Sequence, residues 1–188
     1  MSGNINTDLH KVIQRIIGDI RVELLEEYDR NFERQGFFSE KWQRRRSPIR
    51  QGRAVLIDSG ALRRSIHSRT SASSVTFVSD LPYAAIHNEG GEIKVTRRMK
   101  AFFWHKYYEA TGSFSRGKDG SPRRDKRNLR LSTEAEFWKA MALMRVGAVI
   151  RIPRRRFLGT SPEVEQAVKT IIEDNLTQYF NQLDLSKQ

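Results

Sequence analysis

Residues 7–34 read TDLHKVIQRIIGDIRVELLEEYDRNFER, and they carry the clearest periodic pattern in the chain. Apolar side chains recur there every three or four residues, which is the spacing of one helix face. Thr7 or Asp8 is expected to cap the first free N–H groups. The pattern therefore predicts a helix from residue 8 to about 34, roughly 40 Å long at 1.5 Å per residue. Its apolar positions are Leu9, Val12, Ile13, Ile16, Ile17, Ile20, Leu24, Leu25, Tyr28 and Phe32.

A basic loop is expected after this helix. Residues 43–53 combine several arginines with a proline and a glycine, a composition that interrupts periodicity and is typical of surface loops. The aromatic residues Phe37, Phe38 and Trp42 come just before it and are expected to anchor its base.

A β-hairpin and a short helix are predicted next. Residues 58–60 read Asp-Ser-Gly, which favours a turn. The segment 62–66 is expected to be extended and to pair with 75–78 across a polar link at 71–74. Residues 81–89 then show a short helical pattern, which two glycines end.

The second half of the chain predicts another strand pair and a final helix. Residues 92–96 and 147–152 alternate apolar with polar side chains, which is typical of half-buried strands that can pair with each other. The intervening 97–146 is expected to be an insertion of two short helices around a mobile basic loop at 113–130. Ser161 is expected to cap the last helix, with Pro162 in its first turn.

This order of elements predicts the fold class α+β. We expect an antiparallel sheet of about four strands flanked by a long N-terminal helix, a short middle helix and a C-terminal helix. One domain over residues 1–188, with the insertion at about 97–146, is expected because a chain of this length can bury roughly 70% of its unfolded surface.

The composition narrows the function classes. Lys and Arg total 34 against 22 Asp and Glu, a net charge of +12 that attracts nucleic acid or acidic protein surfaces. The chain has no cysteine, which excludes disulfides, thiolate nucleophiles and cysteine-ligated zinc. No stretch approaches the roughly 20 apolar residues that span a bilayer, and the N-terminus does not resemble a signal peptide. We therefore expect a soluble protein that is made in the cytoplasm and does not act at a membrane.

Three local patterns stand out: DSGALRRSI at 58–66, YAAIHNEGG at 83–91 and IPRRRFLG at 152–159. In the first pattern, Gly60 is expected to adopt a backbone conformation that a larger residue resists. Leu62 and Ile66 are expected to point inward, with Arg63 and Arg64 at the rim.

The other two patterns predict a helix end and a core plug. Tyr83 and Ile86 are expected on one helix face, and residues 87–89 at its end, where side chains hydrogen-bond. In the third pattern, Pro153 is expected to end strand pairing. Phe157 and Leu158 fill the core, and Arg154, Arg155 and Arg156 face outward, available to a partner.

In this order, the three patterns resemble the phage virion morphogenesis family, which includes tail-completion proteins of Mu-like phages. The resemblance covers most of the chain except about 97–146. It implies a non-enzymatic structural protein acting in tail completion or head–tail joining, and we expect no cofactor or metal. The implied fold and assembly positions are Gly60, Leu62, Arg63, Ser65, Ile66, Tyr83, Ala84, His87, Glu89, Gly90, Gly91, Pro153, Arg154, Arg156, Phe157 and Leu158.

The resemblance also implies the partners. The protein is expected to form a ring of identical copies, in which the long first helix and the sheet edge meet neighbouring copies. The ring would contact phage tail and head–tail connector proteins. It would be a virion component that is assembled in the cytoplasm of the bacterial host.

A standalone nucleic-acid-binding module is the alternative function. Basic side chains available to packaged DNA or another partner are Arg44, Arg45, Arg46, Arg123, Arg124, Lys126, Arg127 and Arg155. The aromatic residues at 102–108 can stack on bases, but their three- and four-residue spacing favours a buried or subunit-facing helix.

A hydrolase has the least support. Residues 87–89, His-Asn-Glu, are of the types that activate metal-bound water. The other histidines have no spacing that adds the three or more ligands a metal needs. The nucleophile elbow Gly-x-Ser-x-Gly and the phosphate-binding Gly-x-x-x-x-Gly-Lys are both absent from the sequence.

Overall fold

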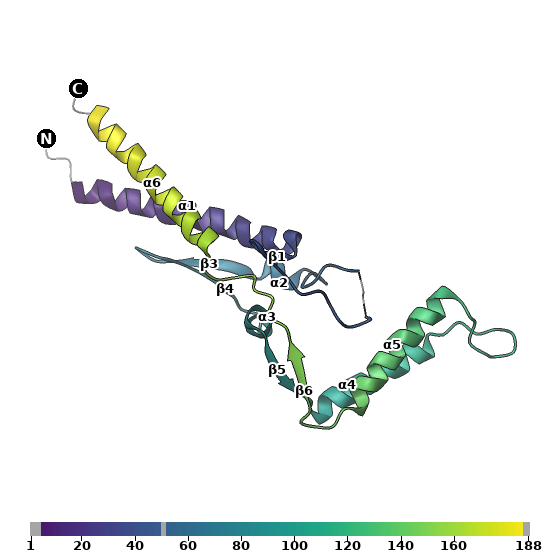
Figure 1. The fold of residues 1–188 in the computed structure, drawn as a ribbon. Coiled ribbons are helices and arrows are strands. Elements are labelled where there is room, and N and C mark those ends of the chain that lie inside the picture. Colours follow the sequence, from purple (N-terminus) through teal and green to yellow (C-terminus); the bar gives the residue numbers. More distant parts are fainter. Residues whose placement is uncertain (1–4, 50–51, 186–188) are drawn as a thin grey trace. The chain divides into compact units, whose positions relative to one another are not determined.

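The computed structural model describes residues 5–49 and 52–185 and forms two compact units. The first unit contains the described parts of residues 1–42, 54–89 and 154–188, and the second contains those of 43–53 and 90–153 (Figure 1). Two positions of the predicted basic loop, 50 and 51, lie outside the described residues. The predicted α+β class is confirmed, because each unit combines helices with antiparallel strands.

Two long helices dominate the first unit: α1, Ile5–Arg34, and α6, Pro162–Leu185. The predicted N-terminal helix is confirmed, but it begins earlier, so residues 7 and 8 lie inside it and do not cap it. The Ser161 hydroxyl accepts a hydrogen bond from the Val164 amide at 3.3 Å, which confirms the predicted cap of α6. The two helices pack together, since Val164 is buried against residues of α1.

Short elements complete the first unit. The strands β1, Gly36–Phe37, and β2, Glu40–Lys41, form a small antiparallel pair. The predicted hairpin is confirmed as β3, Ile66–Thr70, paired with β4, Val75–Ser79. The helix α3, Ala84–Glu89, ends at the predicted glycines.

The prediction that residues 62–65 are extended is wrong. They belong to a short helix, α2, Ala61–Arg64, and its C-cap. Gly60 has the left-handed φ of +73° that favours glycine, as expected. Its carbonyl accepts a hydrogen bond from the Arg64 amide at 3.0 Å, so the turn continues as one helical turn before the strand begins at Ile66.

The second unit is a helical hairpin on a strand pair. The strands β5, Gly91–Lys94, and β6, Val149–Ile152, pair antiparallel, as predicted. Between them lie α4, Arg97–Gly112, and α5, Lys126–Leu143, which pack along each other. The Phe103 ring stacks on the Trp138 ring across this hairpin, with centroids 5.9 Å apart. Residues 126–130, which were expected in a mobile loop, are helical because the Asp125 side chain caps α5.

The expected four-stranded sheet is wrong. The strands form separate two-stranded sheets, with β3–β4 in the first unit and β5–β6 in the second. The apolar face of the first hairpin packs on α1, where the Tyr28 and Phe77 rings meet edge to face at 5.1 Å. The helix α3 lies between the two strand pairs in the chain and ends the first unit's segment, and β5 belongs to the second unit.

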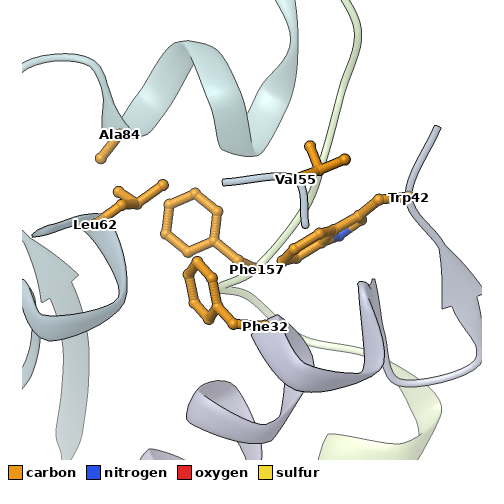
Figure 2. Close-up of a cluster of buried hydrophobic side chains, with 6 residues drawn as sticks. All are labelled: Phe32, Trp42, Val55, Leu62, Ala84 and Phe157. Atoms are coloured by element: carbon orange, nitrogen blue, oxygen red, sulfur yellow. The ribbon is translucent and has the colours of Figure 1, made fainter. Parts of the chain in front are cut away.

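The core of the first unit has two clusters. Figure 2 shows the first, in which Phe157 lies at the centre of side chains from distant segments. Phe32 and Phe157 are 0% and 1% exposed, with ring centroids 5.6 Å apart. Ile66 and Leu158 contact both clusters and make the core continuous. The first cluster contains Phe32, Trp42, Val55, Leu62, Ala84 and Phe157, and the second Ile20, Leu24, Tyr28, Phe37 and Val164.

We predict that Phe157→Ala lowers the free energy of unfolding of the first unit by about 3–5 kcal/mol, because it leaves a cavity where segments meet. The control is Phe180→Ala, since Phe180 is 57% exposed on α6. Urea unfolding is followed by Trp42 fluorescence in a background with Trp104→Phe and Trp138→Phe. Equal effects of the two alanine variants would contradict the central position of Phe157.

Candidate functional site

The three sequence patterns meet in the first unit. Leu62 comes from the first pattern, Ala84 from the second and Phe157 from the third, and all three are buried in one cluster (Figure 2). Segments more than 90 residues apart in the sequence therefore share one packed site. Their shared property is a position in the core, so the patterns encode the packing of this unit.

The backbone of residues 155–159 is held by groups from three other segments, although it belongs to no helix or strand. The Arg155 amide donates to the His87 carbonyl at 2.8 Å. The Trp42 indole N–H donates to the Arg156 carbonyl at 2.6 Å, and the Tyr28 hydroxyl donates to the Gly159 carbonyl at 2.9 Å. Burial raises the pKa of Tyr28, which keeps the phenol protonated as a donor. We call residues 155–159 the clasped segment.

Asn88 is the central contact to the clasped segment. Its side-chain Oδ1 accepts hydrogen bonds from the Phe157 amide at 2.9 Å and from the Leu158 amide at 3.0 Å. One carboxamide thus satisfies two backbone donors of an irregular segment, which otherwise bear a desolvation cost. The sequence predicted that side chains hydrogen-bond at this helix end, but it missed the partner, which lies 69 and 70 residues further along. No local pattern identifies such a partner.

The expectation that residues 154–156 all face outward is wrong for two of the three. Arg154 is exposed, but Arg155 is only 8% exposed. The Arg156 guanidinium lies over the Phe37 ring at 4.5 Å and donates to the Thr160 carbonyl. These arginines contribute to packing because their long side chains can cover apolar surface.

Ion pairs connect the first pattern, residues 58–66, to α1. Arg63 is half-buried and donates from Nε to Asp29 at 2.5 Å and from Nη2 to Glu33 at 2.7 Å. These bonds lower the pKa of Asp29 and raise that of Arg63. Arg64 is exposed and donates to the Ser59 carbonyl at 2.8 Å, so only this arginine keeps the expected place at the rim.

The remaining pattern residues lie near turns. Ser65 donates to the Leu62 carbonyl at 2.8 Å. Tyr83 and Glu89 are exposed at the two ends of α3, and Gly90 follows with φ of +75°. Gly91 pairs with Ile152, the residue before Pro153, at the end of the strand pair.

His87 is the one titratable ring among the three patterns that lies partly inside the core. Burial and the nearby Arg155 cation lower its pKa. Its Nδ1 is buried and has no hydrogen-bond partner among the residues that the structure describes. The ring meets Tyr83 edge to face at 6.0 Å. Protonation of this ring is therefore unfavourable in the folded chain.

Neither a metal centre nor a membrane span is found in the described ranges 5–49 and 52–185. No group of three or more histidine, aspartate or glutamate side chains there is placed to hold a cation. No helix of the same ranges combines the length and apolarity that a bilayer crossing requires.

We predict that Asn88→Ala destabilises the first unit by roughly 1–3 kcal/mol, because two backbone N–H groups lose their acceptor. Asn88→Asp is the matched control, since its carboxylate keeps an acceptor at the same position. Both are measured by urea unfolding in the Trp42-only background. If alanine and aspartate destabilise equally, the acceptor role of Asn88 is refuted.

We also predict that stability falls as the pH drops below 6.5, the ordinary pKa of histidine. The unfolded chain then binds a proton at His87 more readily than the folded chain, whose pKa is lower. His87→Gln is expected to flatten this part of the pH profile of the unfolding free energy. His105→Gln, at an exposed position of the second unit, should leave the profile of the first unit unchanged. An unaltered profile in His87→Gln would refute the assignment.

Comparison with known proteins gives one clear result. The family model described as the phage virion morphogenesis family matches residues 6–177. No curated protein and no solved structure matches the chain. The matched range contains all three patterns and most of α6. The chain therefore belongs to the phage virion morphogenesis family, as a structural component of the phage particle.

Proposed function

We propose that the protein completes the phage tail and joins it to the head as a closed ring of identical copies. Membership of the virion morphogenesis family supports the assembly role. The observation that carries the proposal is the use of the three patterns in the interior, where their side chains pack and bind backbone. Contacts with partner proteins are therefore made by other, exposed surfaces of the chain.

Apolar side chains on α1 support contacts between copies. Leu9, Ile13 and Val22 are 44%, 37% and 52% exposed. Leu9 and Ile13 are four residues apart and share a face, whereas Val22 follows Ile13 by nine residues, about two and a half helical turns. The helix therefore exposes the Leu9–Ile13 pair and the single residue Val22 on nearly opposite sides. A ring needs two different surfaces on each copy, because its contacts run head to tail.

Loss of the gene from its phage tests the joining role. We expect filled heads and finished tails to accumulate unjoined in electron micrographs, and purified protein to restore infectious particles in the mixed lysate. Normal joining without the gene would contradict the proposal.

Sedimentation tests the ring. We predict a discrete oligomer at high protein concentration or on purified tails. The variant pair Leu9→Gln with Ile13→Gln, and separately Val22→Gln, should each weaken self-association by about tenfold or more, since each replaces exposed apolar side chains on one side of α1. Glu26→Gln, at an exposed polar position of α1, is the matched control. A monomer under every condition would refute the ring. The joining role would then still be decided by the gene-loss experiment.

A further inference from the structure

The charge of the chain is concentrated in the second unit. Residues 43–53 and 90–153 contain 20 of the 34 Lys and Arg but only 6 of the 22 Asp and Glu, which gives a net charge of +14. The first unit has 14 basic and 16 acidic residues, a net charge of −2. The positive field of the protein therefore arises from the second unit.

Within this unit, basic side chains gather where α4 turns into α5. We define the hairpin tip as residues 113–130. It contains seven Lys and Arg against two Asp, and all seven basic side chains are exposed. They are Arg116, Lys118, Arg123, Arg124, Lys126, Arg127 and Arg130.

The two carboxylates of the hairpin tip are engaged locally. Asp119 accepts from the Ser121 hydroxyl at 2.7 Å, and this bond lowers the pKa of Asp119. Asp125 caps α5 by accepting from the Asn128 amide at 2.7 Å. Within the described part of the unit, the ion pairs are Lys106–Glu109 and Arg151–Glu92, so none of the seven cations is neutralised by a carboxylate there.

A buried amide holds the hairpin tip in shape. Asn128 is 6% exposed. Its Oδ1 accepts from the Ser115 amide at 2.9 Å, and its Nδ2 donates to the Ser115 and Arg123 carbonyls at 2.8 and 2.7 Å. The Asn128 side chain therefore holds Ser115 and Arg123, on the two sides of the loop, together through hydrogen bonds. The loop that was expected to be mobile is hydrogen-bonded to α5 at these two residues.

We infer that the hairpin tip binds duplex DNA through its phosphates, without reading the base sequence. Seven exposed cations without carboxylate partners suit a polyanion with closely spaced charges, because each phosphate contact releases a bound counterion. The seven cations extend along the loop and the start of α5, and three of them, Arg123, Arg124 and Lys126, line one pocket. Such a spread suits a long polyanion better than a defined acidic peptide, whose recognition uses cations that converge on one pocket.

The structure also narrows the choice among the basic clusters of the sequence. Arg155 is buried, and Arg156 is engaged with Phe37 and Thr160. Burial therefore keeps Arg155 from an incoming phosphate, and the Arg156 guanidinium is already engaged within the first unit. Arg44 and Arg46 are exposed and Arg45 is half-buried in the second unit, and Arg123, Arg124, Lys126 and Arg127 are all exposed in the hairpin tip. This inference does not depend on the ring.

The test measures binding of the full chain to a fluorescent 30-base-pair duplex of random sequence by anisotropy, between 50 and 200 mM salt. The tip variant carries Arg116→Gln, Lys118→Gln, Arg123→Gln and Arg124→Gln. We expect it to bind about tenfold or more weakly at 100 mM salt, with a log–log salt slope shallower by about 3 to 4, because four phosphate contacts are lost.

The matched control removes the same charge from exposed positions at the other end of the hairpin and its base, with Arg97→Gln, Arg98→Gln, Lys139→Gln and Arg145→Gln. It should bind nearly as tightly as the original chain. Circular dichroism checks that both variants fold. Equal losses in the two variants, no binding at 50 mM salt, or equally tight binding to polyglutamate would overturn the inference. The binding measurements use dilute protein, and sedimentation records its oligomeric state. A failure to form the ring is thereby distinguished from a failure to bind DNA.

Discussion

The carboxamide of Asn88 imposes the constraint on which the first unit depends. It accepts from two consecutive amides of the clasped segment and fixes Phe157 and Leu158 where the two core clusters join. Trp42 and Tyr28 hold the same segment by its carbonyls. Three amides and two carbonyls of this irregular segment are thereby hydrogen-bonded, and α6 begins soon after it, next to α1.

The sequence predicted what arises from local repetition. Both long helices, the β3–β4 hairpin and the β5–β6 pair follow from apolar periods and turn residues. It did not predict that the strand pairs belong to different units, because no local pattern indicates whether one strand pair joins another in a single sheet. It also missed the partner of Asn88, since a hydrogen bond from one side chain to a distant backbone has no period. The prediction that Arg155 and Arg156 face outward was wrong, because a run of arginines normally indicates a solvent-exposed segment.

A division of labour between the two units follows from these observations. In the first unit, the motifs that relate the chain to the virion morphogenesis family serve packing and backbone bonding. In the second unit, the helical hairpin of residues 97–143 carries 12 of the unit's 20 Lys and Arg. A structural virion protein needs both features, a rigid body that can repeat and surfaces that meet other components. Local sequence patterns do not show which side chains are exposed, so the candidate contacts come from the exposure and charge that the structure gives.

Hydrogen exchange of individual amides tests the central claim most directly. We expect the Phe157 and Leu158 amides to exchange only through global unfolding of the first unit, with protection equal to that of the buried turns of α1. Rapid exchange of these two amides, at the rate of an exposed loop, would show that the clasped segment is loosely held and would contradict the account.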